Sequence, residues 1–455
     1  MFVALLIGSA ATLPLPAPAS DFFFGAANLS YFNAATLGPC AREVVANTSR
    51  DWAELEANPA NEYFGMFMGA APSFLQRNEA VRAQAAAFLG AAGGAKELAL
   101  MPSTTIALNT VAQGLVDSGF LRRGDRVLTT DQEHAGGYVQ WVHYAHCTPA
   151  LQAMDWCSAA RPVTRANATA GLLGLDLVAI PVAPAAAAPA TPEAVVALFR
   201  AALDAQPRTR VVALSHVTTT HGMALPVKAI AALAHARGAL VVVDGAQALG
   251  MGVNVAALGV DVYASSAHKW LLAPKGSGLL YIAAAAQPLV GALWLDGGMG
   301  VYSGFTGTRP AHTIQGLGYA IDYFARYGGP AAVGAHNLAL RARAFDLLAP
   351  VLARHAGAEV IGARSRDGPL ASPILTFSVP APWTAHTLAS ALYDRGIIVK
   401  EGGRNVAPNE GGPTMPAEAV RLSFHLYHGA REVEELVDAI DEVLRNGTAA
   451  PPALE

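Results

Sequence analysis

Residues 261–282 read DVYASSAHKWLLAPKGSGLLYI. The apolar runs at the two ends of this stretch predict buried strands, and the Pro- and Gly-containing segment between them predicts a turn. Lys269 lies in that connection, between His268 and Trp270. A lysine that forms a Schiff base has to be uncharged near neutral pH, and apolar surroundings favour the uncharged amine. A surface lysine whose charged end reaches solvent is the alternative that this stretch leaves open.

An acidic residue follows the next strand-like run upstream. The segment LVVV of residues 240–243 is followed by Asp244, Gly245, Ala246 and Gln247. An aspartate at the carboxyl end of a strand can pair with the nitrogen of a pyridine ring, and a protonated nitrogen makes that ring an electron sink. The alternative is a common Asp-Gly turn that only ends the strand.

Two further segments come earlier in the chain. Ser103, Thr104 and Thr105 precede a helical run. Free amides and hydroxyls there suit a phosphate group, although an ordinary helix cap has the same sequence. His134 follows the strand-like VLTT of residues 127–130, where its ring can stack on a pyridine face or belong to a solvated loop. The order and spacing of the four segments, more than any one of them, indicate a site for a phosphorylated pyridine cofactor.

The long middle part of the chain has the pattern of an α/β domain. Between about Ala80 and Ile282, helical periods alternate with short apolar runs such as RVVALSH at residues 210–216. Such runs predict buried parallel strands joined by helices, with ligands at the carboxyl ends of the strands. We therefore expect a large domain over residues 80–327. Residues 145–192 interrupt the pattern, and APAAAAPATPE at residues 183–193 predicts a surface connection.

The remaining segments predict a smaller domain and peripheral pieces. A helical run, three strand candidates and a closing helix over residues 328–446 indicate an α+β domain. Residues 21–79 are expected to contribute to the substrate pocket and to the smaller domain, and residues 447–455 to form a tail. Residues 1–20 resemble the apolar and cleavage regions of a secretory signal without its positively charged leader. Export, and a leader without an address on a cytoplasmic protein, both remain open.

Composition narrows the class of partner. Of 455 residues, 53% are hydrophobic and 14% are charged, and the formal net charge is -4. The chain has no Lys/Arg cluster, so neither a nucleic acid nor an anionic membrane is an expected partner. Beyond the amino terminus no apolar run is long enough to span a bilayer. The sequence leaves open a Cys147–Cys157 disulfide. It also leaves open glycosylation at the Asn-x-Ser/Thr sites, which start at Asn28, Asn47, Asn167 and Asn446.

The four segments together resemble a known family. The order Ser-Thr-Thr, Glu-His, Asp-Gly-Ala-Gln and His-Lys is similar to that of class V aminotransferases, which are fold type I (aspartate-aminotransferase-like) enzymes of pyridoxal 5'-phosphate (PLP) and include the cysteine desulfurases. SHVTTTHGMALPV, VVVDGAQALGM, SAHKWLLAPKGSGLLY and GFTGTRP are most similar to the isopenicillin N epimerase-like branch. The resemblance extends from about Tyr31 to Val443. It implies PLP as the cofactor, an amino acid as the substrate and no metal.

The resemblance also implies roles at the cofactor. Lys269 would hold PLP as a Schiff base and later move a proton at the substrate α-carbon. His134 would stack on the ring, Asp244 would hold its nitrogen, and Gln247 would contact its hydroxyl. Thr308 matches a position that completes the phosphate cup from a second subunit, which implies a homodimer. The remaining phosphate ligands implied are Thr104, Thr105, Ser266 and His268.

Substrate residues follow from the same resemblance. Arg421 matches an arginine that clamps a substrate carboxylate, a task for which a bidentate guanidinium is suited. Asn33 lies in a segment that commonly lines the substrate pocket. His216 stands where desulfurases carry an asparagine near the cofactor hydroxyl.

The resemblance leaves the reaction open. The desulfurase cysteine that should precede VRLS is missing, because residues 400–419, KEGGRNVAPNEGGPTMPAEA, contain no Cys. We therefore expect transamination or epimerisation at the α-carbon. The alternative is a carbon–sulfur lyase acting on a cysteine-derived substrate, since β-elimination needs no enzyme thiol. A protein of this fold that only binds, without catalysis, is the alternative from a different class.

Overall fold

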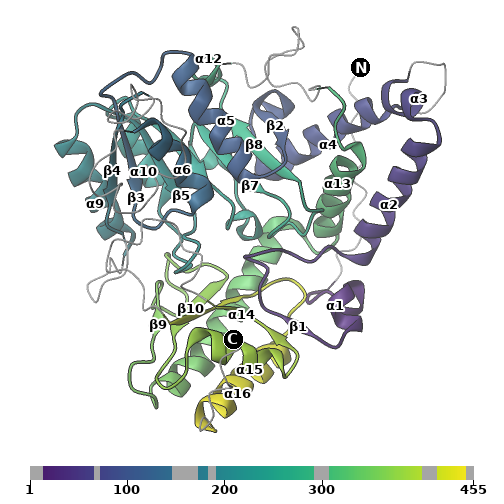
Figure 1. Ribbon diagram of the computed structural model, residues 1–455, viewed down its shortest axis with the longest axis vertical. Coiled ribbons are helices and arrows are strands. Elements are labelled where there is room, and N and C mark those ends of the chain that lie inside the picture. Colours follow the sequence, from purple (N-terminus) through teal and green to yellow (C-terminus); the bar gives the residue numbers. More distant parts are fainter. Residues whose placement is uncertain are drawn as a thin grey trace, which may run out of the picture.

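The computed structural model describes residues 14–65, 72–145, 173–182, 191–291, 307–401 and 418–446. Figure 1 shows a larger part built around one sheet and a smaller part, below it in the view, that contains α15 (Ala385–Tyr393) and α16 (Ala430–Arg445). This arrangement confirms the predicted α/β fold with a mostly parallel sheet and a smaller α+β part. Cys147, Cys157, Asn167, the first thirteen residues and the tail after residue 446 lie outside the described residues.

Among the described residues, the larger sheet has seven strands in the order β2-β8-β7-β6-β5-β3-β4. β8 is antiparallel to both of its neighbours, whereas the other pairs are parallel. Its connection to β7, residues 267–277, is too short for the crossover helix that a parallel strand needs. In chain order the strands are β2 (Leu98–Met101), β3 (Arg126–Thr130), β4 (Asp176–Ile180), β5 (Thr209–Ser215), β6 (Leu240–Asp244), β7 (Val262–Ser266) and β8 (Gly278–Ile282).

One strand was not predicted from the sequence. β4 lies inside residues 145–192, where the sequence pattern is interrupted. β4 is an edge strand of the sheet, and Ile180 is its one buried residue. A half-exposed edge strand lacks the continuous apolar run by which buried strands are recognised, so the pattern does not mark it.

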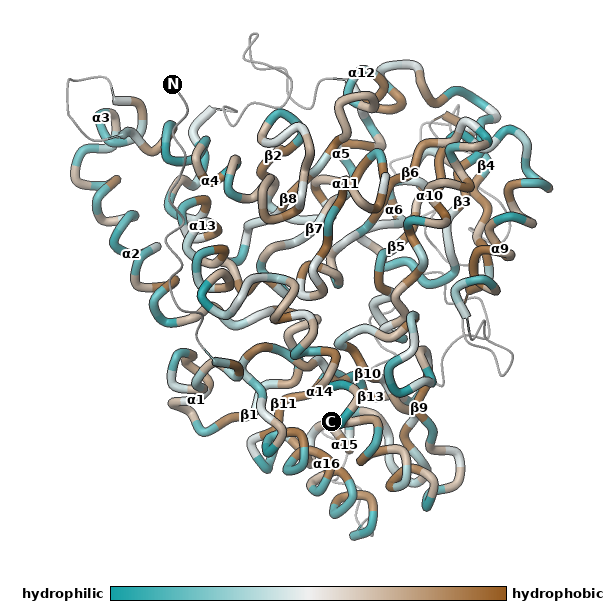
Figure 2. Tube along the Cα trace, turned by 180° about the vertical axis from the view of Figure 1, so that it is seen from behind, coloured by the Kyte–Doolittle hydropathy of each residue, from teal (hydrophilic) through white to brown (hydrophobic). Residues whose placement is uncertain are grey.

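Helices cover both faces of this sheet, which is why its central strands are apolar throughout. Val242 packs with α5 (Thr104–Asp117) and α6 (Ala135–Tyr144), and Val241 and Val243 pack with α9 (Pro192–Ala205) and α10 (Val227–His235) on the opposite face. Successive side chains of a strand point to opposite faces. Figure 2 shows the apolar composition of the central strands as hydrophobic colouring, in contrast to the hydrophilic colouring along the peripheral α2 (Arg42–Ala57).

A second helical group covers the β2 edge of the sheet. α2 and α4 (Phe74–Leu89) pack against α13 (Ala311–Arg326), and α4 contacts β2. α3 (Pro59–Phe64) extends from α2 at the periphery (Figure 1). The N-terminal segment therefore packs largely on the large part, although Phe32 joins the core of the small part.

In the part of the chain that the structure describes, the small part is a four-stranded antiparallel sheet covered by helices. Its strand order is β12-β13-β10-β9, and β1 pairs with β11 beside it. α14 (Gly329–Leu352) links the two parts, since Val333 lies in the large core and Leu340 and Leu348 lie in the small one. The strands are β1 (Ser30–Tyr31), β9 (Val360–Ile361), β10 (Ile374–Ser378), β11 (Ile397–Ile398), β12 (Lys400–Glu401) and β13 (Ala419–Ser423).

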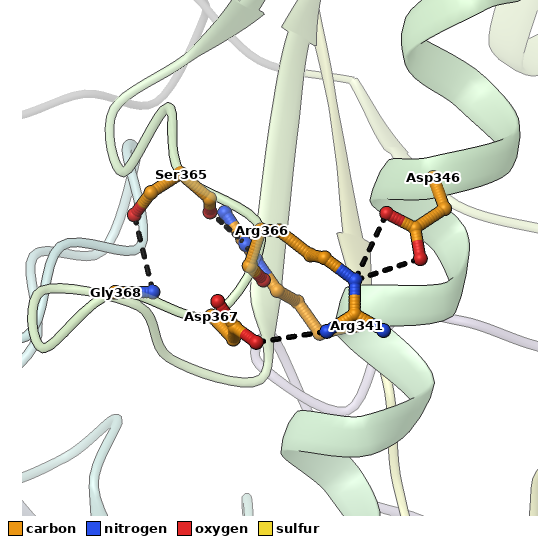
Figure 3. Close-up of polar contacts among 6 residues, drawn as sticks. All are labelled: Arg341, Asp346, Ser365, Arg366, Asp367 and Gly368. Carbon is orange, nitrogen blue, oxygen red and sulfur yellow. Dashed lines mark hydrogen bonds and ion pairs between the residues drawn. The ribbon is translucent and has the colours of Figure 1, made fainter.

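A buried arginine fixes the loop that follows β9. The guanidinium of Arg341, on α14, donates to the backbone carbonyls of residues 363, 365 and 366. Figure 3 shows Arg366 beside it, bonded to Asp346 on α14 and to Asp367 in the loop, at 2.8 Å each. Farther along, Ser372 Oγ donates to the carbonyl of Gly222 at 2.7 Å. The small part thereby supports the 218–224 turn of the large part.

Two neutral histidines fill the joint between the parts. Nε2 of His425 donates to the Trp270 carbonyl (2.9 Å), and Nε2 of His428 donates to the Tyr31 carbonyl (3.0 Å). Nδ1 of each ring accepts a backbone N–H, from Leu426 (2.8 Å) and from His425 (3.1 Å) respectively. Since neither Nδ1 can bind a proton without losing its donor, both rings are held uncharged.

This joint predicts a loss of stability in acid. Burial lowers the pKa of His425 to about 3 and that of His428 well below its usual 6.5. Both rings therefore stabilise the fold fully above pH 6.5, and that contribution is lost as the pH falls, because the unfolded chain binds the protons. Because of the two rings, the free energy of unfolding should be about 3 kcal/mol lower at pH 5.5 than at neutral pH.

Urea denaturation at pH 7.5 and pH 5.5 measures this effect. A His425→Gln/His428→Gln variant removes both titrating rings, so its stability should change between the two pH values by about 3 kcal/mol less than that of the original protein. An identical pH dependence in the two proteins would contradict the prediction.

Candidate active site

The predicted site residues gather at one edge of the large sheet. Asp244 ends β6 and Ser266 ends β7. His134 follows β3 and caps α6, where its Nδ1 accepts the N–H of Gly136 at 3.0 Å. The carboxyl ends of parallel strands meet at this edge, which is where ligands of open α/β sheets bind.

The surroundings of Lys269 favour the uncharged form of its amine. Burial lowers the pKa of Lys269 to about 8; Asp244 opposes this shift and the Arg421 charge adds to it. Part of the side chain remains open to solvent, and its amine has no hydrogen bond to any residue that the structure describes. Because its pKa is lowered to about 8, more of the Lys269 amine is uncharged near neutral pH than in an ordinary lysine, and the uncharged amine is the form that binds a cofactor covalently.

His134, Asp244 and Lys269 form one electrostatic group. Burial and the Lys269 charge lower the pKa of His134, while Asp244 opposes this shift. Asp244 is buried, and its Oδ1 accepts the N–H of Ala246 at 2.9 Å. A Cβ on Gly137 would lie 2.8 Å from Asp244 Oδ2, so only glycine lets the first turn of α6 come this close. The structure thus brings these three predicted residues together.

The start of α5 meets the end of β7 beside them. The N–H of Thr104 donates to Ser266 Oγ at 3.0 Å, and the two side-chain hydroxyls are 2.8 Å apart. A Cβ on Gly136 would lie 2.3 Å from Thr105 Oγ1, so the starts of α5 and α6 lie side by side. His268 Nδ1 is buried and lacks a hydrogen-bond partner in the described part of the chain. Two helix N-termini with spare donors suit a phosphate dianion.

Arg421 is a buried cation without an acidic partner. It is 6% exposed, and burial lowers its pKa to about 10. Its guanidinium donates to the Thr219 carbonyl (3.0 Å) and to Thr36 Oγ1 (2.7 Å), and Thr36 donates to Asn33 Oδ1 (2.7 Å). Nε has no partner, and no carboxylate pairs with Arg421 among the residues described. A buried guanidinium with unused donors is suited to the carboxylate of a substrate.

This group joins two predicted residues through one that the sequence did not indicate. Asn33 and Arg421 both take part as expected, whereas Thr36 carries the hydrogen bond between them. Nothing in the composition around Thr36 distinguishes it from an ordinary turn residue.

Three predicted residues, Gln247, Thr308 and His216, are not joined to these groups by the described contacts. Gln247 donates to the Ala35 carbonyl (3.0 Å) and accepts from Trp270 Nε1 (2.8 Å), so its contact with the cofactor hydroxyl stays a prediction. Thr308 is exposed and makes no described contact with the Thr104–Ser266 pair; its role across a dimer also stays a prediction.

His216 lies away from the group. Its Nδ1 is 2.9 Å from the hydroxyl of Tyr263, and burial lowers its pKa to about 4. The register of β7 with β6 places Tyr263 on the α10 face, opposite to the side chain of Asp244. Its assignment to substrate binding is a prediction that the described contacts do not support.

Among the described residues, no cluster of three or more His, Cys, Asp or Glu side chains has the arrangement of a metal site. None of the helices described is both long enough and apolar enough to span a membrane.

Comparison with known proteins identifies the family. The model of the family "Aminotransferase class-V" matches residues 30–156 and 186–436. The chain belongs to the class V aminotransferase family. The family uses pyridoxal phosphate, and the backbone and hydroxyl donors at the starts of α5 and α6, the Lys269 amine and the Asp244 carboxylate fit that cofactor.

Relatives of this class V protein include bacterial sulfur enzymes. A probable cysteine desulfurase of Vibrio cholerae is 31% identical over 384 residues, covering 80% of this chain and 82% of the relative. A cysteine desulfurase of Klebsiella pneumoniae is 30% identical over 383 residues, covering 81% and 82%. These relatives give no support to the isopenicillin N epimerase-like branch that the sequence motifs suggest.

Solved structures show the same fold. The apo cysteine desulfurase of Thermococcus onnurineus superposes with a TM-score of 0.74 at 22% identity, covering 96% of this class V chain and all of the other. A cystine C–S lyase in complex with its reaction product, cysteine persulfide, superposes with a TM-score of 0.69 at 21% identity, covering 92% and 98%.

Proposed function

We propose that this protein is a PLP-dependent carbon–sulfur lyase that acts on a cysteine-derived amino acid. The buried, unpaired Arg421 beside Lys269 carries the proposal, because this pair can hold a carboxylate within reach of a proton-transferring amine. The choice of a sulfur substrate is supported by relatives whose names describe cysteine desulfuration and cystine cleavage.

The residues would share the work as follows. PLP, when bound, supplies an electron sink for negative charge at the substrate α-carbon. Asp244 would hold the ring nitrogen, and Thr104, Thr105, Ser266 and His268 would hold the phosphate. Arg421 would bind the substrate carboxylate, and Lys269 would accept the α-proton. A depressed lysine pKa makes this amine an effective base near neutral pH.

The chain offers no cysteine where sulfur transfer to the enzyme would need one. Residues 400–419 contain no Cys. Cys40 is the one cysteine that the structure describes, and burial raises the pKa of its thiol, which disfavours the nucleophilic thiolate. We therefore infer that the C–S bond breaks by β-elimination: the α-proton is lost, and the electron pair of the bond leaves with sulfur. Water then converts the remaining three-carbon unit to pyruvate and ammonia.

Product analysis tests the reaction. The holoenzyme is incubated with cystine, S-methylcysteine and alanine. Pyruvate, ammonia and the released sulfur product are measured; β-elimination gives a persulfide from cystine and methanethiol from S-methylcysteine. Pyruvate and ammonia in equal amounts from the sulfur amino acids, with no product from alanine, are expected. A Cys40→Ala variant should keep this activity. Racemised alanine, or a keto acid formed without ammonia release, would instead support epimerisation or transamination at the α-carbon.

The non-catalytic alternative predicts a different result. A protein that only binds PLP would retain the cofactor in full, yet no amino acid would change its visible absorbance or give any product. That outcome would remove the proposal of a lyase.

We also propose that the active unit is a homodimer. α2 and α3 carry exposed large apolar side chains, Val45 (36%), Trp52 (54%) and Phe64 (42%), which a second copy would cover. The exposed Thr308 agrees with a role across such an interface. Sedimentation of a monomer at working concentrations would exclude this proposal.

A further inference from the structure

A buried carboxyl group lies directly behind the active site. Glu133 precedes His134 in the turn after β3 and is 3% exposed. Three donors converge on it: the Thr130 hydroxyl (2.6 Å), the Ser215 hydroxyl (2.6 Å) and the Ser215 N–H (3.1 Å). The N–H of Gln132 donates to Thr130 Oγ1 at 3.2 Å, so the proton of that hydroxyl is directed to Glu133. This set of donors favours the ionised carboxylate.

These bonds fix the position of the His134 turn. Glu133 connects the ends of β3 and β5, because Thr130 is the last residue of β3 and Ser215 is the last residue of β5. His134 is the next residue, and it caps α6. The ring that would lie against the cofactor is therefore anchored through its neighbour.

The same carboxyl lies beside Asp244. Ser215 and Asp244 are register partners on adjacent parallel strands, so their side chains point to the same face of the sheet. Neighbouring strands are about 4.8 Å apart. Burial raises the pKa of Glu133 to about 7, and the negative charge of Asp244 adds to this shift.

We propose that Glu133 is a positioning residue of the cofactor site, which holds the His134 turn against β5 and places a second negative charge beside Asp244. When Glu133 is ionised, that charge raises the affinity of the bound cofactor for protons. The inference rests on the cofactor site of the proposed function and is independent of which substrate bond is cleaved.

The charged groups near Glu133 lie on the cofactor side of the sheet. Asp244 is the charged group that acts on Glu133 directly. His134, Lys269 and Arg421 act with Asp244 on the cofactor side, and no cation forms an ion pair with Glu133 in the part of the chain described. Removal of the Glu133 charge is therefore not masked by a partner.

A pH titration of the holoenzyme tests the proposal. The visible absorbance of bound PLP is recorded from pH 6 to pH 10 for the original protein and for Glu133→Gln, which keeps the size of the side chain and removes its charge. The midpoint of the absorbance change should fall by about one pH unit in the variant. PLP retention after ultrafiltration should fall by less than about threefold, because glutamine can keep most of the hydrogen bonds.

Two further variants complete the test. Glu97→Gln removes another buried carboxyl, at the end of η2 (Gly94–Glu97). The Glu97 carboxylate accepts the N–H groups of Gly93 and Ala284, and its replacement should leave the midpoint unchanged. Thr130→Val removes one donor to Glu133, so it should lower the midpoint in the same direction as Glu133→Gln by a smaller amount. This variant serves if Glu133→Gln does not fold.

The outcomes separate the two proposals. An unchanged midpoint in Glu133→Gln or Thr130→Val, with PLP bound, overturns the role of Glu133. Failure of the original protein to bind PLP overturns the proposed function instead. A midpoint that shifts equally in Glu97→Gln also overturns the proposal, since the effect would then be general to buried carboxyls.

Discussion

The Lys269→Ala variant is expected to lose on the order of 10⁴-fold in kcat/KM while it keeps its fold. The reason is that Lys269 combines a pKa lowered to about 8 with an amine that makes no described hydrogen bond. Alanine removes the group that would bind the cofactor and accept the α-proton. Steady-state release of pyruvate from a sulfur amino acid, with the PLP content of each sample recorded, measures the loss.

A second lysine of the same connection serves as the control. Lys275 lies in the turn before β8 and donates to the Gly38 carbonyl at 2.6 Å. Lys275→Ala should keep kcat/KM within about threefold, because it removes a single structural hydrogen bond. If Lys269→Ala kept a tenth of the activity or more, Lys269 would not be the base.

The Arg421→Met variant is expected to lose about 10²-fold or more in kcat/KM for an amino-acid substrate. A bidentate guanidinium–carboxylate contact in a buried site has about twice the strength of a neutral hydrogen-bonded pair. Its loss costs about 3 kcal/mol, which is about 150-fold. Methionine keeps the volume of the side chain, and it removes a buried charge that has no acidic partner, so the fold should persist.

Decarboxylated substrates reveal whether this effect is specific. For the amine that lacks the α-carboxylate, Arg421→Met should bind as well as the original protein, with affinity followed by the absorbance of PLP. Arg343→Met is the matched control, because Arg343 forms an exposed ion pair with Glu434 and should change neither affinity. An equal loss for the amine and the amino acid would show that Arg421 does not bind the carboxylate.

Much of the site was accessible from the sequence because each residue ends a recognisable strand. Asp244 follows LVVV, His134 follows VLTT, and Ser266 and Lys269 follow a third apolar run. In a parallel sheet such ends meet, so their proximity follows from strand order alone. Fold class and cofactor are confirmed for this reason.

Contacts between distant parts of the chain were not accessible. Arg421 was predicted, but its bond to Thr36 was not, because the two residues are 385 positions apart and meet only where the N-terminal segment crosses both parts of the molecule. The direction of β8 depends on the length of its connection, which the apolar pattern of GLLYI does not express. The orientation of His216 depends on the face of the sheet to which its side chain points just after β5 ends. The reaction is decided by the shape of the pocket around the substrate side chain, which the pattern of apolar and polar residues does not express.

Helix α14 has a consequence for how the chain can be divided. Its first turns pack beside η3 (Leu249–Met251) in the large core, and its later turns pack under β10 in the small one. We therefore propose that the predicted boundary after Tyr327 does not divide the chain into two pieces that fold independently. A fragment that starts there would expose the apolar surface of Val333, and one that ends there would leave a gap above η3. Neither half should be stable as a separate fragment, and the folding cooperativity of each should depend on the other.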